Sequence, residues 1–382
     1  MSETQTLDRF ADEEPFIQTV APARPRLASA GRVFVVMVVC LGLWGVLAAP
    51  ALERNAAAGP IGARRAVALA LLRPLGGISD ALRLSRASEA VERALGRDPR
   101  GTPGGELVLP DLNLPPEVVV PAPTTPEPAP PITGNGQVPP PEPTPTQEGE
   151  PQPPELTGIR SPTSSNRLRV AVIGDSLAQG LGPAIERAMD PEVVRVLSLG
   201  RISTGLSRQD YFNWQAGMRQ IVEEFRPDLV FIMLGSNDGQ DQIARDGSEI
   251  PVGSAEWIEG YEERAGALLR EATEAGTHVV WVGIPIVEER QRWAFYRRVN
   301  GIYRDAARSD PMATYVDTWA AFEARAGGYA AYIRNERGLL QLMRAPDGIH
   351  FTPSGYWYLG RLAMRAATEA FGLPQEAVSF RI

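Results

Sequence analysis

Residues 168–177 read LRVAVIGDSL, and this stretch decides the fold class of the C-terminal part of the chain. An apolar, strand-forming run at 168–173 ends in glycine and leads through a polar loop into a helix-forming stretch. The alternation continues to the C-terminus, with strand-like runs at 193–199, 229–234, 278–284 and 315–317 and helix-like stretches at 184–189, 214–225, 257–275 and 290–307. Strands that alternate with helices predict a parallel sheet covered on both faces. We therefore predict an α/β domain over residues 166–382, with its sites at the carboxyl ends of the strands.

An uncharged apolar run, VFVVMVVCLGLWGVLAAPAL, occupies residues 33–52. At about 1.5 Å per residue, a helix of this length crosses a hydrocarbon core of about 30 Å, so we predict one transmembrane helix. A cleaved signal peptide is the alternative, because Ala49 and Ala51 form a small-x-small site. Acidic residues in the preceding stretch favour an uncleaved anchor. Arginines lie on both sides of the run in similar numbers, so charge alone leaves the orientation open.

Two flanking segments differ from the apolar run. Residues 1–32 are polar and poor in aromatic residues, which predicts a disordered tail. Residues 53–100 carry apolar residues at helical spacing and predict juxtamembrane helices, interrupted at Pro74 and at the glycine pair 76–77. These helices are expected to form a juxtamembrane pair that carries no chemistry. The alternative is that they lie on the membrane surface or pair with another copy of the chain.

A proline-rich segment at 101–165 separates these helices from the α/β domain. Of the 35 prolines in the chain, 19 fall within residues 101–162. Such a composition predicts an extended, semi-stiff linker that lets a catalytic domain reach a polymer away from the lipid. A ligand for a domain that recognises proline-rich peptides is the alternative.

Composition excludes several kinds of chemistry. All 38 basic residues are arginine, so a Walker phosphate loop, a pyridoxal Schiff base and a lysine base are ruled out. One cysteine and two histidines build neither an internal disulfide nor an ordinary zinc site, and we expect no cofactor and no metal, with only carboxylate metal binding left open. Eight acidic residues and no arginine lie in 101–158 and account for the net charge of −8. With no basic surplus elsewhere, nucleic acid is not an expected partner.

Two loops carry the residues of a nucleophilic site. Ser176 directly follows the first strand-like run, where a hydroxyl faces the crevice beside a helix N-terminus, although serine is also an ordinary helix cap. A serine needs a base, and only His278 and His350 are available. His278 opens an apolar strand and is expected to pack there, whereas His350 lies in a loop. Asp347, three residues before it, is placed to orient the imidazole.

A third loop, Leu234-Gly235-Ser236-Asn237-Asp238, follows the third strand-like run. The Asn237 amide is suited to donate to an oxyanion beside the serine loop. A plain turn is the alternative, because Gly, Asn and Asp are common turn residues.

Together these blocks resemble the SGNH or GDSL hydrolase superfamily over about the last 217 residues. The matching blocks are Gly174-Asp175-Ser176-Leu177, Gly235-Ser236-Asn237-Asp238 and Asp347-Gly348-Ile349-His350, in the family's order. The resemblance implies a flavodoxin-like three-layer fold with a parallel sheet. It also implies roles for individual residues: Ser176 as nucleophile, His350 as base, Asp347 as orienting acid, and the Ser176 amide, the Asn237 side chain and the Gly205 amide as oxyanion donors, with Gly200 as the alternative glycine.

The stretch STGLSRQDYFNW at 203–214 is similar to an envelope-associated branch of this superfamily that is catalogued as a domain of unknown function. That branch resembles domains associated with adding or removing O-acetyl groups on cell-surface glycans. Arg208, Asp210 and Trp214 are expected to line the substrate cleft, with Trp214 stacking on a sugar ring. The alternative for Trp214 is packing in the core at the start of a helix.

The resulting hypothesis is a membrane-anchored serine esterase or acyltransferase that acts on O-acyl groups, chiefly O-acetyl groups, of a cell-envelope polysaccharide or peptidoglycan. It would be a single-pass protein of a bacterial inner membrane, held by residues 33–52, with its catalytic domain in the periplasm. The sequence does not distinguish water from a sugar hydroxyl as the acceptor, and it carries no signal for oligomeric state. A lipase-like or thioester hydrolase and an inactive glycan-binding or scaffold module are the alternatives.

Overall fold

A computed structural model of the chain describes residues 30–59, 62–82, 107, 109, 158–244, 246–335 and 337–379. Most of the predicted tail (1–32) and most of the proline-rich linker (101–165) lie outside these residues.

Five parallel strands form the central sheet in the order β2-β1-β3-β6-β7. Their bounds are β1 Leu168–Gly174, β2 Val194–Gly200, β3 Leu229–Met233, β6 His278–Val282 and β7 Ala313–Val316. All five residues of β3 and of β6 are buried, whereas the edge strands β2 and β7 are partly exposed. The chain starts in the middle of the sheet, runs to one edge and then crosses to the other, which is the flavodoxin-like order. The fold class predicted from the sequence is confirmed.

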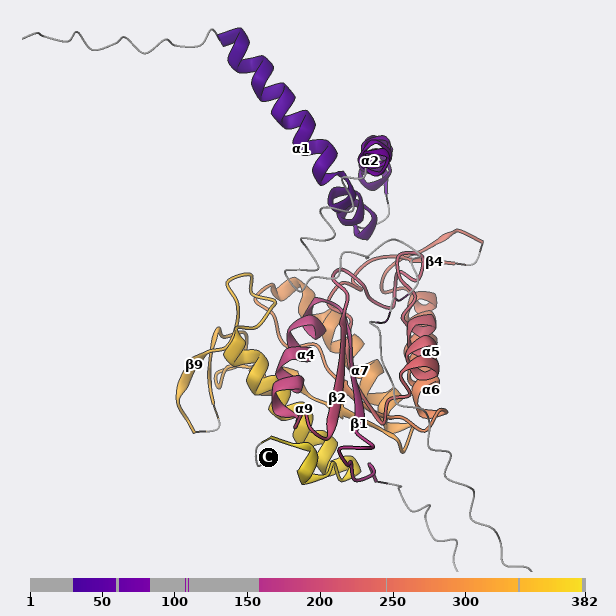
Figure 1. The fold of residues 1–382 in the computed structure, drawn as a ribbon, viewed down its shortest axis with the longest axis vertical. Coiled ribbons are helices and arrows are strands. Elements are labelled where there is room, and N and C mark those ends of the chain that lie inside the picture. Colours follow the sequence, from indigo (N-terminus) through magenta and orange to yellow (C-terminus); the bar gives the residue numbers. More distant parts are fainter. Residues whose placement is uncertain are drawn as a thin grey trace, which may run out of the picture.

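Helices cover both faces of this sheet (Figure 1). Their bounds are α4 Ser176–Ala188, α5 Trp214–Glu224, α6 Ala255–Thr273, α7 Trp293–Arg308 and α9 Pro353–Phe371. Helices α4 and α9 pack against each other on one face, and α5, α6 and α7 lie on the other, giving three layers. Each helix buries an apolar stripe, as amphipathic helices that flank a buried sheet do. The smaller elements are β4 Gln242–Ile243, β5 Glu249–Ile250, η1 Arg290–Arg292, α8 Thr318–Phe322, β8 Tyr332–Arg334, β9 Leu340–Leu342 and η2 Gln375–Ala377.

Helix α4 begins eight residues before the predicted stretch at 184–189. Its N-cap is Asp175, whose side chain accepts a hydrogen bond from Leu177 N at 2.9 Å. Glycines at 180 and 182 weaken the helical signal of its first turns. Both are explained by close packing, since a Cβ at Gly182 would lie 1.8 Å from Ser198 Oγ on β2.

The ordered domain also begins earlier than predicted. Residues 158–165, assigned to the linker, are bound to the domain, with Ile159 N donating to Phe371 O at 2.9 Å. Arg160 forms a bidentate ion pair with Asp228, at 2.7 and 2.9 Å, just before β3. The prediction of a linker reaching to 165 is wrong at this end, because a long-range ion pair leaves no local sequence signal.

Of the two N-terminal helices, α1 is longer than predicted and α2 is more continuous. Helix α1 spans Ala30–Ala58, beyond both ends of the predicted 33–52, and α2 spans Ala63–Ala81. The expected interruption of α2 at Pro74 and at the glycine pair 76–77 is wrong, because the helix runs through them and packs against α1. By length and composition α1 can cross a membrane, and a signal sequence near an N-terminus shares these features.

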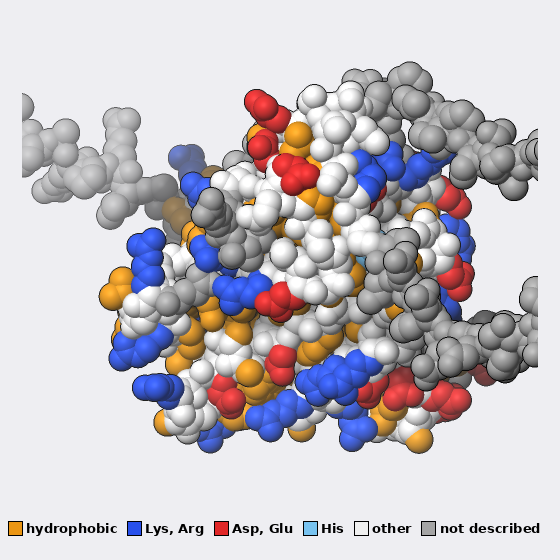
Figure 2. Space-filling model, turned by 90° about the horizontal axis from the view of Figure 1, so that it is seen from below, with side chains coloured by type: hydrophobic (Ala, Val, Ile, Leu, Met, Phe, Trp, Pro, Cys, Tyr) orange, Lys and Arg blue, Asp and Glu red, His pale blue; other side chains and the backbone are white. Residues whose placement is uncertain are grey.

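The end of the domain that points away from α1 has a mixed surface (Figure 2). Arginines and acidic side chains are interspersed there, with apolar side chains between them.

Candidate active site

The first candidate residue, Ser176, is placed by the junction of β1 and α4. Gly174 ends β1 with φ of 145°, and a Cβ there would lie 1.8 Å from Met233 O on β3. Only glycine fits where the two strands approach so closely. The chain then leaves the sheet at the residues that follow. Ser176 is then the first residue of α4, so its backbone N–H lies outside the helical hydrogen-bond ladder.

The structure brings the predicted serine, histidine and aspartate together. His350 Nε2 lies 2.8 Å from Ser176 Oγ, although the two residues are 174 positions apart. His350 Nδ1 lies 2.6 Å from Asp347 Oδ2. The side chains of His350 and Asp347 are 34% and 50% exposed, so the relay opens to solvent. This arrangement can draw a proton from the serine hydroxyl and hold the imidazole in one orientation.

The charge of Asp347 is fixed by its own loop. Partial burial opposes its ionisation, but hydrogen bonds from the His350 ring and from the backbone amides of His350 and Ile349 outweigh it and lower the pKa of Asp347 to about 2. A carboxylate that stays ionised above this pH is available to stabilise an imidazolium at neutral pH.

A buried arginine holds the loop that carries both residues. Arg344 is 1% exposed, and its guanidinium donates to the carbonyl oxygens of Ile349 at 2.7 Å, His350 at 3.3 Å, Gly348 at 3.4 Å and Ile286. The Arg344 guanidinium also lies over aromatic rings, including that of Phe351 with its centroid 4.7 Å away. Burial lowers the pKa of Arg344 to about 10. Local sequence alone did not single it out, because its acceptors are backbone atoms.

A buried carboxylate links the serine loop to the asparagine loop. Asp175 accepts hydrogen bonds from Ser236 N at 3.0 Å and Ser236 Oγ at 2.7 Å, in addition to Leu177 N. Burial raises the pKa of Asp175 to about 6, and these hydrogen bonds oppose the increase. Asp175 therefore sets the spacing between Ser176 and the loop that contains Asn237.

Asn237, the predicted oxyanion donor, lies beside the loop after β2. Its Nδ2 donates to Thr204 O at 3.0 Å, and an amide nitrogen carries a second hydrogen that this contact does not use. The N–H of Gly205 belongs to the same trans peptide as Thr204 O and points the opposite way. Asn237 thus contacts the peptide that also carries Gly205 N–H, and the expectation that the two groups share one oxyanion stays a prediction.

The two glycines considered for this role are explained by packing. A Cβ at Gly205 would lie 2.1 Å from Asp238 Oδ1, and one at Gly200 would lie 2.4 Å from Gln179 N. The close approach at Gly205 lets the buried Asp238 carboxylate accept from Leu206 N at 2.9 Å and Ser207 N at 2.8 Å. Burial raises the pKa of Asp238, despite these bonds and one from the Tyr261 hydroxyl at 2.7 Å.

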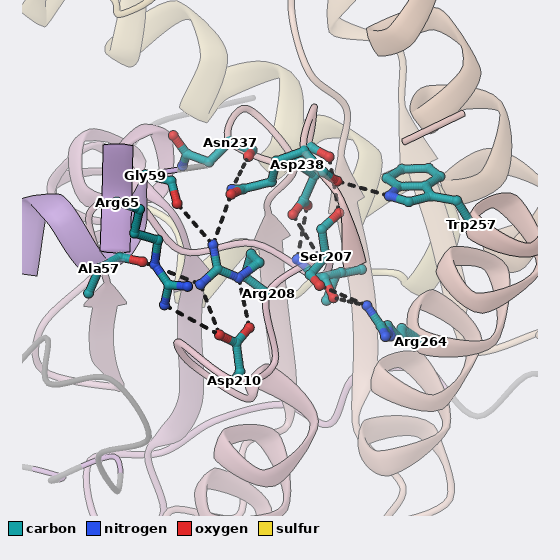
Figure 3. A network of polar contacts seen from close by, with 12 residues as sticks. Ala57, Gly59, Arg65, Ser207, Arg208, Asp210, Asn237, Asp238, Trp257 and Arg264 are labelled. Atoms are coloured by element: carbon teal, nitrogen blue, oxygen red, sulfur yellow. Dashed lines mark hydrogen bonds and ion pairs between the residues drawn. The ribbon is translucent and has the colours of Figure 1, made fainter. Parts of the chain in front are cut away.

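The three predicted substrate-lining residues have other partners. Trp214 is 1% exposed, packs at the start of α5 and donates from Nε1 to Thr204 Oγ1 at 2.9 Å. This burial contradicts the expectation that it stacks on a sugar and agrees with the core alternative. The Arg208 side chain is 2% exposed and all its nitrogens have protein partners, while Asp210 is paired with Arg208. The structure thus contradicts a substrate-lining role for Arg208 in this arrangement (Figure 3), whereas for Asp210, whose side chain is 37% exposed, that role stays a prediction.

Two further positions complete the description. His278 lies at the start of β6, buried against Phe371 with ring centroids 4.8 Å apart, as expected for a packing histidine. Ser203 adopts φ of 61°, a strained value for a residue other than glycine, in the loop next to Asn237. Within the described residues, no group of three or more His, Cys, Asp or Glu side chains is arranged to hold a metal.

Comparison with solved structures finds chains of similar fold at low identity. An α/β-hydrolase enzyme from the metagenome of Lake Arreo, Spain, is 19% identical, with 53% of this chain and 96% of that chain covered and a TM-score of 0.38. A catalytic mutant of an acetylxylan esterase from Geobacillus stearothermophilus is 18% identical, with 52% and 94% covered and a TM-score of 0.36. A GDSL-like lipase from Bacteroides thetaiotaomicron is 15% identical, with 53% and 88% covered and a TM-score of 0.36.

A comparison with curated proteins finds no match. One family model matches residues 169–366, a range that runs from β1 into α9 and contains every residue of the candidate site. The expectation of a family catalogued without a function is confirmed. The chain therefore belongs to the family described as "Protein of unknown function (DUF459)".

Proposed function

We propose that this protein is a serine esterase or acyltransferase of the SGNH type. The single observation that carries the proposal is the chain of hydrogen bonds from Ser176 Oγ to His350 Nε2, at 2.8 Å, and from His350 Nδ1 to Asp347, at 2.6 Å. An inactive binding module has no need of such a relay. Its partly exposed position at the carboxyl edge of the sheet gives substrates access.

The proposed reaction proceeds in two acyl-transfer steps. His350 takes the proton of Ser176 as Oγ forms a bond to the ester carbonyl carbon, and Asp347 stabilises the imidazolium. The Ser176 amide and the Asn237 side chain donate to the tetrahedral oxyanion. The intermediate collapses, the C–O bond to the alcohol breaks, and His350 returns the proton to the leaving alcohol. His350 then deprotonates water or a sugar hydroxyl, which attacks the acyl carbon. The second intermediate collapses, the C–O bond to Ser176 breaks, and His350 returns the proton to Ser176 Oγ.

The substrate we propose is an O-acyl, chiefly O-acetyl, ester on a cell-envelope glycan. Two features support it: α1 is apolar enough to anchor the chain in a membrane, and the relay is open enough for a polymer side group. A single-pass protein of a bacterial inner membrane with a periplasmic domain fits this role. Acetate release from acetylated envelope polysaccharide, followed by NMR against the deacetylated polymer, tests this assignment.

The catalytic roles are tested on the full chain purified in detergent with p-nitrophenyl acetate. We expect Ser176→Ala and His350→Ala to lower kcat/KM by at least about 10³-fold, since removing a nucleophile or its base leaves only binding and oxyanion stabilisation. The matched control is His278→Ala, because the chain has only these two histidines. Equal losses in the two histidine variants, with both folded, would show that the base is not His350.

A further inference from the structure

The junction between α1 and α2 is bound to the α/β domain by one buried arginine. Arg208 Nη1 donates to Gly59 O at 3.1 Å, and Nη2 donates to Ala57 O at 3.3 Å (Figure 3). Ala57 is in the last turn of α1, and Gly59 follows the helix end. Carbonyls at a helix C-terminus lack helical donors and carry partial negative charge, so a guanidinium suits them.

An acidic residue beside Arg208 makes a second interaction with the same junction. Asp210 accepts from Arg208 Nε at 2.7 Å and Nη2 at 2.8 Å, and it pairs with Arg65 of α2 at 3.8 Å. The Arg65 side chain is 23% exposed, whereas its neighbour Arg64 is exposed. The end of α1 and the start of α2, residues 57–59 and 62–69, form a hairpin. A cationic side chain of the domain binds the carbonyl oxygens of this hairpin, and an anionic side chain of the domain binds its arginine.

Arg208 also reaches the candidate oxyanion donor. Its Nη1 donates to Gln240 Oε1 at 3.1 Å, and Gln240 Nε2 donates to Asn237 O at 2.8 Å. The hairpin carbonyls, Arg208, Gln240 and the Asn237 loop therefore form one continuous hydrogen-bonded series. Figure 3 shows the hairpin residues and Asn237 arranged around the Arg208 guanidinium.

We propose that Arg208 is a positioning residue through which docking of the hairpin orders the Asn237 loop, so that ester turnover is fastest in the docked state. The inference rests on the proposed function of Ser176 and Asn237. When the hairpin leaves, two donor groups of a buried guanidinium lose their acceptors, and such groups are costly to leave unpaired. The guanidinium then reorients, and Gln240 loses its hold on the Asn237 loop.

This coupling changes the role that we expect for the proline-rich linker. Docking holds the candidate site beside the end of α1, and hence beside the surface of any membrane that α1 crosses. In the docked state, the length of the linker then does not set the reach of the candidate site. We infer that the productive substrate lies near that surface.

The test compares Arg65→Glu with Arg64→Glu in the full chain reconstituted in lipid nanodiscs. Both variants reverse one charge on α2, but only Arg65 contacts Asp210. Hydrogen exchange of residues 57–70 and 235–240 reports docking, and hydrolysis of p-nitrophenyl acetate reports turnover. We expect Arg65→Glu to speed hydrogen exchange in both segments. We also expect it to lower kcat about tenfold with KM nearly unchanged, which is less than the ~100-fold loss of rate that a 1 Å misplacement of a catalytic group can cause. Arg64→Glu should match the wild type.

A double-mutant cycle with Arg208→Gln tests whether the two residues act in one event. Arg65→Glu should add little to the loss of kcat already caused by Arg208→Gln, because both release the same hairpin. Additive losses would overturn the coupling, as would faster exchange of the hairpin with unchanged kcat. Equal exchange of residues 57–70 in the wild type and Arg65→Glu would overturn docking. If the wild type hydrolyses no ester, the proposed function fails, and exchange at 235–240 alone decides whether the hairpin orders the loop.

Discussion

At the scale of single residues, the candidate site depends on a carboxyl group that lies beneath its loops. Asp175 caps α4 and binds Ser236, and it is wholly buried. Burial raises its pKa from 3.8 to about 6. As the pH rises from about 4, the unfolded chain therefore loses this proton before the folded protein does, and the free energy of unfolding falls until the folded group has also ionised.

Asp175→Asn should remove this pH dependence, because an amide does not titrate. We expect the stability of the wild type relative to Asp175→Asn to fall by on the order of 2 kcal/mol between about pH 4 and pH 7. Thermal melting of the two proteins across this range measures the difference. Asp305→Asn, at an exposed position on α7, controls for loss of a carboxylate. A constant difference between wild type and Asp175→Asn would show that Asp175 ionises alike in both states.

At the scale of elements, the segment between β9 and α9 is a loop that buries Met343 and Phe351 at its ends and is held between them by hydrogen bonds. It carries Asp347 and His350, and Arg344 binds three of its carbonyl oxygens and one from the chain after β6. A hydrogen bond from a charged donor contributes about 1.5–3 kcal/mol. Arg344 therefore determines where the imidazole lies without touching it.

Arg344→Met should lower both stability and turnover. Methionine fills part of the volume but leaves several buried carbonyls without donors, so we expect a loss of about 3 kcal/mol in the free energy of unfolding. Arg344→Lys should restore the charge but little of the activity, since a single ammonium group cannot make the several hydrogen bonds of a planar guanidinium. Chemical denaturation and kcat measure the two effects, with Arg334→Met on exposed β8 as the control. Full activity in a folded Arg344→Met protein would contradict the positioning role.

At the scale of the whole molecule, the position of the chain relative to a membrane can be read from its only cysteine. Cys40 lies on α1 and is exposed on the helix surface. If α1 spans a bilayer, lipid covers this thiol, so an impermeant maleimide should label it only after detergent is added. Labelling of Cys40 in intact membranes would contradict the span.

The side that the domain faces follows from a second labelling position. In a Cys40→Ala background, Ser164→Cys places a thiol on the exposed start of the α/β domain. A periplasmic domain predicts labelling of this thiol in cells with a permeabilised outer membrane. Labelling only after the inner membrane is opened would place the domain in the cytoplasm.

Local patterns in the sequence determined the order of strands and helices, the apolar helix and the identities of Ser176, Asp347 and His350. Strand and helix periodicities and a loop glycine are short-range properties, and the parallel topology they imply already brings strand ends to one edge. The role of the Gly205 amide stays a prediction, because the direction of one peptide plane is not encoded in a motif.

The contacts of Arg208, Asp210, Trp214 and Arg344 follow from tertiary packing and not from local patterns. Some of their partners lie far away in the chain, as with Arg208 and Gly59, which are 149 positions apart, and Arg344 and Ile286, which are 58 apart. In the sequence an arginine that lines a cleft and one that binds backbone carbonyls look alike. The difference lies in burial and in which donors are already paired, and these depend on how distant segments pack.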